Sequence, residues 1–314
     1  MWPMNGLSLA KQYFADCGLP MIRQSFPTYE QRIAAGLVGE GSECFGFDDD
    51  ISRDHDWGPS FCLWLTDADY EKIGCALTDA YNALPGDFLG FSRREVSEFG
   101  GGRVGVMPTS HFYWKYTGLK TAPTTLLEWR RLPENYLAVV TNGEVFMDSL
   151  GKFSAIRQKL LAFYPEDVRL KKIVARAAIM AQSGQYNYAR SIKRKEYVAA
   201  QCALYEFIRA AFSMVYLLNK RYMPFYKWAH RGIKDLPVLS ETYVMFSDLC
   251  ADRCDGDAHA KREKIIEQLC TLVIAELKRQ SLTDSNSDFL QDHCTQIMQR
   301  IKDEDIRRLH ILAE

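Results

Sequence analysis

The sequence predicts an α+β protein, in which a small domain with a mixed sheet is followed by a C-terminal helical bundle. Two observations predict this class. Short apolar runs bounded by glycine, proline and asparagine alternate with helical patterns up to about residue 150, and after that nearly every segment has helical spacing. We therefore assign residues 1–150 to an α/β domain and residues 151–314 to the bundle.

The first half of the chain contains both helix and strand signals. The run 61–65 is apolar and rich in aromatic residues, as in a buried strand. An Asn142-Gly143 turn predicts a hairpin between strands over 136–140 and 145–147. The other expected segments are a helix over 7–17, a helix passing into a strand over 30–38, a helix capped by Thr66 or Asp67 and ending near Leu84, and strands over 104–107 and 112–116.

The second half is expected to be helical almost throughout. Its breaks fall at glycine, proline and short polar loops, which end helices. The expected helices cover 152–163, 165–182, 195–219, 240–250, 258–279 and 287–301.

Composition limits the classes of protein that the chain can belong to. The 314 residues carry a formal net charge of -1, so the overall charge does not favour a nucleic-acid partner. The nine cysteines show no disulfide spacing, and the N-terminus lacks the pattern of a signal peptide. The longest apolar run, 210–218, is far shorter than the roughly 20 residues that span a bilayer. We expect a cytoplasmic protein without a membrane partner.

The most informative segment runs from Gly39 to Pro59. A Gly41-Ser42 turn is followed, after eleven residues, by Asp54 and Asp56. In an extended strand residues i and i+2 point to the same face, so the two carboxylates are expected to project together. Gly41 would allow the backbone to approach an anionic group closely.

These residue types suit the transfer of a nucleotide. Gly41 and Ser42 would hold the phosphates of a nucleoside triphosphate, and Asp54 and Asp56 would bind Mg²⁺, a hard cation that prefers oxygen ligands. A glycine loop beside a solvated acidic turn would contain the same residues without this function. An apolar strand before the turn, another after the carboxylates, and the compact spacing favour the functional interpretation.

The chain resembles a known group in these residues. An apolar strand, Gly-Ser and then Asp-x-Asp is the pattern of the polymerase-β-like nucleotidyltransferase superfamily. More closely, the chain resembles an uncharacterised bacterial nucleotidyltransferase-like family, a domain of unknown function, and its plan is similar to that of the aminoglycoside nucleotidyltransferases. The segments that carry the resemblance are Ser52–Pro59, Leu132–Glu134, Asn142–Asp148, Tyr164–Val168, Asn219–Tyr222, Pro224 and Lys227–Trp228.

This resemblance implies a nucleotidyltransferase fold, an NTP substrate and Mg²⁺, and it leaves the acceptor open. Enzymes of the superfamily usually have a third carboxylate on a later strand, as a metal ligand or general base. Asp148 is the best candidate here, with Glu144 and Glu98 as alternatives. Asp148 is equally suited to cap the following helix.

Asn219, Lys227 and Trp228 form a second group of candidate residues. In the family interpretation the bundle completes the nucleotide site, with Lys227 reaching the triphosphate and an aromatic ring stacking on the base. Without the resemblance, Lys227 is more simply a surface lysine beside a half-buried tryptophan.

Two functions of different classes therefore remain. The first is a Mg²⁺-dependent nucleotidyltransferase that moves an NMP from an NTP to a hydroxyl on a small molecule, a protein or an RNA 3′ end. The second is a non-catalytic nucleotide-binding or interaction module, such as a toxin–antitoxin-type or regulatory partner. Short basic runs at 130–131 and 193–195 leave a nucleic-acid partner open without favouring it.

Overall fold

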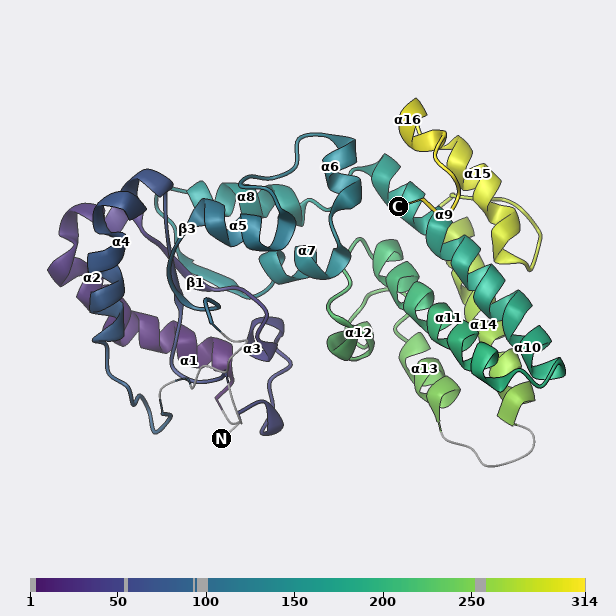
Figure 1. The fold of residues 1–314 in the computed structure, drawn as a ribbon, viewed down its shortest axis with the longest axis horizontal. Helices are drawn as coiled ribbons and strands as arrows, with labels where there is room; N and C mark the ends of the chain where they lie inside the picture. Colours follow the sequence, from purple (N-terminus) through teal and green to yellow (C-terminus); the bar gives the residue numbers. More distant parts are fainter. Residues whose placement is uncertain (1–3, 54–55, 93, 95–100, 252–257, 314) are drawn as a thin grey trace. The chain divides into compact units, whose positions relative to one another are not determined.

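The computed structural model describes residues 4–53, 56–92, 94, 101–251 and 258–313 (Figure 1). The chain forms two compact units, and each is described by itself. The sheet unit comprises residues 1–123 and 136–162, and the helical unit comprises residues 124–135 and 163–314. The units thus interleave along the chain, where the sequence predicts one boundary near residue 150. The predicted α+β class is confirmed, because a mixed sheet with helices precedes a mainly helical region.

The sheet unit is built on four short strands in the order β3-β2-β1-β4. The central strand β1 pairs antiparallel with both β2 and β4, and β3 pairs parallel with β2. Their bounds are Ala34–Leu37 for β1, Cys62–Leu65 for β2, Gly105–Pro108 for β3 and Glu144–Met147 for β4.

Helices cover both faces of this sheet. The helical segments of the unit are α1 (Gly6–Tyr13), the π-helical η1 (Phe14–Gly18), α2 (Leu19–Ser25), the 3-10 turn η2 (Pro27–Arg32), α3 (Ser42–Phe45), the 3-10 turn η3 (Ile51–Arg53), α4 (Asp67–Asn82), α5 (Thr109–Thr117) and α8 (Lys152–Leu161), with α7 (Glu134–Thr141) leading into β4.

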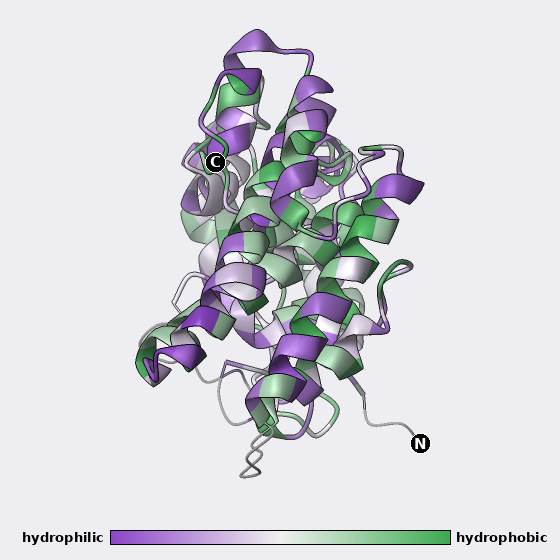
Figure 2. Ribbon diagram, turned by 90° about the vertical axis from the view of Figure 1, so that its right-hand side faces the viewer, coloured by the Kyte–Doolittle hydropathy of each residue, from purple (hydrophilic) through white to green (hydrophobic). Residues whose placement is uncertain are grey.

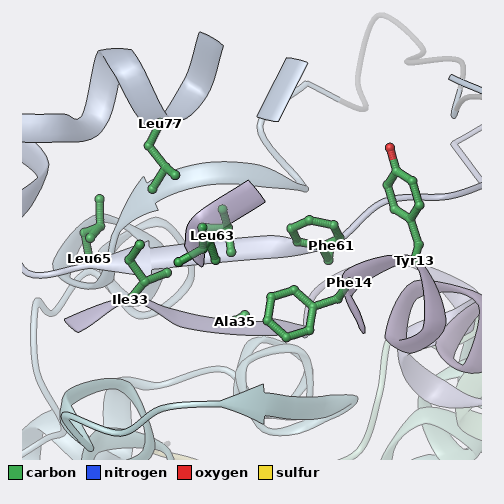
Figure 3. Close-up of a cluster of buried hydrophobic side chains, with 9 residues drawn as sticks. Tyr13, Phe14, Ile33, Ala35, Phe61, Leu63, Leu65 and Leu77 are labelled. Atoms are coloured by element: carbon green, nitrogen blue, oxygen red, sulfur yellow. The ribbon is translucent and has the colours of Figure 1, made fainter. Parts of the chain in front are cut away.

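The alternation of side chains along β2 divides the core into two layers. Leu63 and Leu65 lie in a buried cluster with Phe14 of η1 and Leu77 of α4 (Figure 3). On the opposite face, Trp64 stacks on Phe153 of α8 with 3.9 Å between ring centroids. Both layers are therefore dry, and β2 is buried along its whole length.

Most predicted elements of the first half are confirmed. The expected helix over 7–17 is α1 with η1, and the strand expected at the end of the segment 30–38 is β1. The strand over 61–65 is β2, the Thr66-capped helix is α4, and the strand over 104–107 is β3. Each had strong apolar periodicity and a clear boundary signal.

Two strand predictions are wrong because aromatic and β-branched residues were taken as strand formers. The segment 112–116 lies in helix α5, where Phe112, Tyr113 and Tyr116 share one buried face and Gly118 ends the helix at φ 71°. The segment 136–140 lies in helix α7. The predicted strand over 145–147 does form, as β4, but it pairs with β1 and not with 136–140, so the predicted hairpin is wrong.

The helical unit contains the predicted long helices, whose hydrophilic and hydrophobic residues alternate as in amphipathic helices (Figure 2). Helix α9 packs along α11, α15 and α16 pack against α9, and α13 packs against α12 and α14. The bounds are α6 Leu126–Arg131, α9 Glu166–Met180, π-helical η4 Ala181–Tyr188, α10 Ala189–Lys193, α11 Tyr197–Leu218, α12 Tyr226–Ile233, α13 Thr242–Cys250, α14 Ala258–Arg279, the 3-10 turn η5 Leu290–His293, α15 Cys294–Gln299 and α16 Glu304–Arg307.

Helix α11 is long and apolar enough, by length and composition alone, to cross a membrane. Core helices of soluble proteins meet the same criterion. In this structure Leu204, Phe207, Met214 and Leu217 of α11 are buried in the helical unit.

The ion pair between buried Asp69 and exposed Arg32 in the sheet unit gives a pH-dependent test of this fold. The Asp69 carboxylate accepts from Arg32 Nε and Nη2 and from the Thr66 hydroxyl, at 2.8–3.1 Å. Burial alone raises the pKa of Asp69, but these hydrogen bonds and the charge of Arg32 outweigh burial and hold the pKa below its ordinary value. The stabilisation is therefore complete above about pH 3.9 and disappears as the pH falls through the lowered pKa.

We expect Asp69→Asn to lower the free energy of unfolding by about 1–3 kcal/mol at pH 7. The difference from wild type should shrink steadily as the pH is lowered below about 4, as measured by urea unfolding. Asp79→Asn, at an exposed position of the same helix, is the matched control and should change the stability by less than about 0.5 kcal/mol at either pH. A constant deficit at all pH values would contradict this account.

Candidate functional site

The candidate site is built on the turn that leaves β1. Gly39 has a φ of 155°, and Gly41 precedes helix α3, which begins at Ser42. The predicted strand before the Gly41-Ser42 turn is present as β1, and the short helix that begins at Ser42 was not predicted. Ser42 is half-buried, and its hydroxyl makes no hydrogen bond to any residue that the structure describes.

Asn142 holds this turn in place. Its side-chain amide accepts from the Gly39 N–H at 3.0 Å and donates to the Gly39 carbonyl at 2.7 Å. The next residue, Gly143, donates its N–H to the Cys44 carbonyl at 2.8 Å. A Cβ at Gly143 would lie 1.9 Å from the Leu37 carbonyl oxygen, so only glycine allows the two segments to come this close.

A buried ion pair lies beneath the turn. Arg94 Nη1 donates to Glu43 Oε1 at 2.9 Å, and both side chains are at most 5% exposed. The Glu43 carboxylate takes up the space beside Gly41, where a Cβ would lie 2.2 Å from Oε1. The absence of a Cβ at Gly41 thus makes room for the Glu43 carboxylate, and the predicted approach of a phosphate to Gly41 stays a prediction.

Asp56 is connected to the same turn through Arg103. Asp56 is 7% exposed, and its carboxylate lies 3.2 Å from Arg103 Nη1. Nε of Arg103 is 3.4 Å from the Glu40 carboxylate, which also lies 3.9 Å from Lys115 Nζ. Two carboxylates thus share one guanidinium beside the Gly39–Ser42 turn. Asp54, the other predicted metal ligand, lies outside the described residues.

The prediction that an extended strand carries the two aspartates is wrong at Asp56. Residues 51–53 form a 3-10 turn, and Asp56 has a φ of 52° within a bend. A non-glycine residue in this left-handed region is strained by about 1–2 kcal/mol. The bend, and not strand alternation, directs this carboxylate toward Arg103.

Asp148 caps the start of helix α8, which is the alternative role that the sequence offers for it. Its Oδ1 accepts from the Gly151 N–H at 2.9 Å and its Oδ2 accepts from the Ser154 N–H at 2.7 Å, so both oxygens serve the start of α8. Of the alternatives, Glu144 forms an ion pair with Lys11 at the surface, and Glu98 lies outside the described residues.

The residues of the second predicted group belong to the helical unit. Lys227 is exposed on α12, with Nζ 5.2 Å from the centre of the Trp228 ring. The Asn219 side chain accepts from the Val238 N–H and donates to the Val215 and Val238 carbonyls, and so fixes a loop.

The side chains around the turn supply some of the oxygen ligands that a cation such as Mg²⁺ needs. Asp56 and Glu40 supply hard carboxylate donors, which suit Mg²⁺. Within the described ranges no three histidine, cysteine or acidic side chains form a metal-binding group, and Asp54 is outside those ranges.

Burial raises the pKa of Cys44, and that of Cys62 to about 12, so both thiols are neutral near pH 7 and neither is a nucleophile.

Sequence reasoning missed Glu40, Glu43, Arg94 and Arg103. The two glutamates flank Gly41 and could have been noticed by their position alone. The arginines are more than 40 residues away in the sequence, and their contacts depend on the tertiary fold. No local pattern marks them.

Comparison with known proteins supports part of the resemblance. Residues 129–229 match the model of a family described as a domain of unknown function, DUF4037. This range contains the quoted segments from Leu132–Glu134 to Lys227–Trp228 and leaves out Ser52–Pro59. No curated protein and no solved structure matches the chain. The function must therefore be argued from the geometry of the site.

The close approach of Gly143 gives a direct test of the turn. We expect Gly143→Ala to lower the free energy of unfolding by more than about 3 kcal/mol, because it adds a backbone clash to the cost of a left-handed φ. Gly151→Ala is the matched control, since Gly151 has a φ of 69° and open space at its Cβ position. It should cost only about 1–2 kcal/mol. Equal losses in denaturant unfolding would contradict the clash.

Proposed function

We propose that the sheet unit is the catalytic domain of a Mg²⁺-dependent nucleotidyltransferase, which moves an NMP from an NTP to a hydroxyl acceptor. The observation that carries the proposal is the buried Asp56 carboxylate, held by Arg103 beside the Gly39–Ser42 turn. Strand β1 leads into the turn, and β2, which follows Asp56, pairs antiparallel with β1. This is the order of elements that the superfamily pattern requires.

In this proposal Ser42 and the backbone of the turn hold the triphosphate, and Asp54 and Asp56 hold Mg²⁺. Glu40 is a further candidate carboxylate, because Arg103 brings it and Asp56 to one cation. Bound Mg²⁺ would neutralise the leaving pyrophosphate. Asp56 becomes available to a metal once Arg103 moves aside, and Arg103 and Lys115 are then placed to contact phosphate oxygens.

The natural acceptor stays open among a small molecule, a protein side chain and an RNA 3′ end. The role of Lys227 in nucleotide binding stays a prediction of the resemblance. A cytoplasmic location, where ATP and Mg²⁺ are abundant, is part of the proposal.

One observation favours the alternative of a non-catalytic nucleotide-binding or interaction module, such as a toxin–antitoxin-type or regulatory partner. Both oxygens of Asp148, the best candidate for a third carboxylate, accept backbone N–H groups of α8. An enzyme without that carboxylate needs another base for the acceptor hydroxyl. Release of pyrophosphate separates the two functions, since only the transferase produces it.

We expect ATP, GTP, CTP or UTP to raise the melting temperature in a Mg²⁺-dependent way, and Asp56→Asn to abolish the Mg²⁺-dependent part of that rise. Loss of the ion pair with Arg103 could mimic this result. Arg103→Gln is therefore the control, since it breaks the same pair and keeps the carboxylate. It should keep a Mg²⁺-dependent rise, smaller in size because the contact of Arg103 with the phosphates is lost. If both variants lose the response equally, or if Asp56→Asn keeps it, the metal role of Asp56 is wrong.

Ser42→Ala should weaken NTP binding by a factor of about 2–12, because one hydrogen bond is lost, at about 0.5–1.5 kcal/mol. Isothermal titration with the nucleotide that gives the largest thermal shift measures this change. Ser110→Ala, at the start of α5, is the control and should leave the affinity unchanged. An unchanged affinity of Ser42→Ala would remove the hydroxyl from the phosphate site.

A further inference from the structure

One stretch of the helical unit is strongly basic, although the chain as a whole has a net charge of -1. Residues 207–234 contain six lysine and arginine residues and no aspartate or glutamate, while acidic residues make up 40 of the 314 residues of the chain. Five of these six cations lie in the range 220–234, which comprises the loop after α11 and helix α12 with its C-terminal cap (Figure 1). The basic charge is therefore concentrated on a small part of the unit.

The cations of α12 form a stripe on its exposed side. Lys227, Arg231 and Lys234 are all exposed, and their spacing of i, i+4 and i+7 places them on one face of the helix, over a length of about 10 Å. Ala229 and Ile233 lie on the other side, are at most 1% exposed and pack into the unit. Like charges at this spacing weaken a helix, so the stability of α12 does not explain the stripe. A negatively charged partner would remove the repulsion.

The two lysines of the stripe are not neutralised within the part of the chain that the structure describes. Neither Lys227 nor Lys234 forms an ion pair with a described carboxylate. Lys227 Nζ lies 5.2 Å from the centre of the Trp228 ring, and Lys234 Nζ lies 4.3 Å from the centre of the Tyr243 ring on α13. A lysine ammonium has three N–H donors, and a ring contact uses none of them as a conventional hydrogen bond. Both lysines can therefore donate to the oxygens of an anion.

Exposed aromatic rings lie at the start of the same helix. Tyr226 is 73% exposed and Phe225 is 46% exposed, and their ring centres are 4.5 Å apart. Most of the Tyr226 surface is therefore open to solvent. Within residues 219–234, all of which the structure describes, these two rings are the exposed large apolar side chains. We call the following residues the α12 face: Phe225, Tyr226, Lys227, Arg231 and Lys234.

We propose that the α12 face binds a single-stranded nucleic acid, with phosphates on the stripe of cations and bases stacked on Tyr226 and Phe225. Proteins bind single strands without sequence preference by combining cations that follow the backbone with aromatic rings that stack on bases. A duplex hides the faces of its bases, so it would use the cations alone. In the proposed function such a strand makes an RNA 3′ end the acceptor, and only this step rests on the proposed function.

An anionic membrane would also attract the cations of the α12 face. A helix that binds a membrane surface inserts its apolar face among the lipids. The apolar side of α12 is turned into the protein instead, where the Tyr216 hydroxyl also donates to the Ala229 carbonyl at 2.9 Å. The side chains left outside are aromatic rings and cations, which suit bases and phosphates better than acyl chains.

The test measures the binding of fluorescein-labelled oligonucleotides to the full chain by fluorescence anisotropy, without NTP or Mg²⁺. A uridine dodecamer should bind at least about fivefold more tightly than an RNA duplex of the same length, because only the single strand offers its bases for stacking. Equal or tighter binding of the duplex would overturn the proposal. A deoxythymidine dodecamer distinguishes DNA from RNA as the source of the strand. Tighter binding of the uridine strand supports an RNA acceptor, and the reverse order would contradict it.

Tyr226→Ala tests the stacking. It should weaken binding of the uridine dodecamer about 5- to 150-fold and leave the salt dependence of binding unchanged, because the ring carries no charge. Tyr205→Ala is the matched control, since Tyr205 is 59% exposed on α11 and has Arg209 beside its ring. The control should bind as wild type does. Unchanged affinity of Tyr226→Ala, or an equal loss in both variants, would overturn the proposal.

The double variant Lys227→Gln/Lys234→Gln tests the stripe. The slope of log affinity against log salt concentration should become shallower by about 1.4, because each phosphate contact of a single strand contributes about 0.7. Lys72→Gln/Lys159→Gln is the control, since it removes the same charge at exposed positions of the sheet unit. It should keep the wild-type slope. An equal change in both double variants would show an effect of overall charge and would contradict the α12 face.

Vesicles of phosphatidylserine and phosphatidylcholine test the membrane alternative. Vesicle binding together with no binding of either dodecamer would assign the α12 face to a membrane and overturn the proposal. Absence of oligonucleotide binding would end this inference, and a Mg²⁺-dependent response to any NTP would still support the proposed nucleotidyltransferase. Oligonucleotide binding together with no response to NTP and Mg²⁺ would support the α12 face alone, so the two proposals fail separately.

Discussion

The sheet unit depends on the close approach of Asn142 and Gly143 to the end of β1. The Asn142 amide satisfies the N–H and the carbonyl of Gly39, which no neighbouring strand satisfies, and Gly143 continues the contact to Cys44. Because a Cβ at Gly143 would collide with the β1 backbone, the contact requires glycine. The turn before Ser42 is therefore fixed by a segment more than 100 residues further along the chain.

With the turn fixed, charged groups are brought into the sheet unit and must be neutralised there. Glu43 is balanced by Arg94, and Asp56 by Arg103. Buried pairs of this kind add little net stability, because desolvation offsets their attraction, but loss of one partner is strongly destabilising. In the proposed function these pairs serve binding rather than stability. Each arginine thus neutralises one carboxylate of this region.

The sequence predicted the fold well where one physical signal dominated. The continuous apolar, aromatic-rich run 61–65 predicted β2, and Thr66 marked the start of α4. The prediction failed at Phe112 and its neighbours, where aromatic residues favour strands in isolation but are buried on one side of a helix here. Tertiary packing overrode local propensity at that point.

The candidate site was predictable to a similar degree. The turn at Gly41 and Ser42 was predicted from residue type and spacing, because a turn after a strand is a local feature. The direction of Asp56 was not, since a left-handed bend replaces the expected strand. Arg94 and Arg103 follow glycine-rich and loop-forming sequence that has no periodicity, and only the assembled sheet brings them to the glutamates of the turn.

The central claim is that Asp56 and the Gly39–Ser42 turn form one metal-dependent nucleotide site. Its most direct test is anomalous diffraction from crystals grown with Mn²⁺ and a non-hydrolysable NTP analogue. The account predicts a manganese peak at about 2.1 Å from the Asp56 carboxylate, Arg103 displaced from it, and phosphates against the turn. A nucleotide bound elsewhere, or Asp56 still paired with Arg103 and no manganese beside it, would contradict the claim.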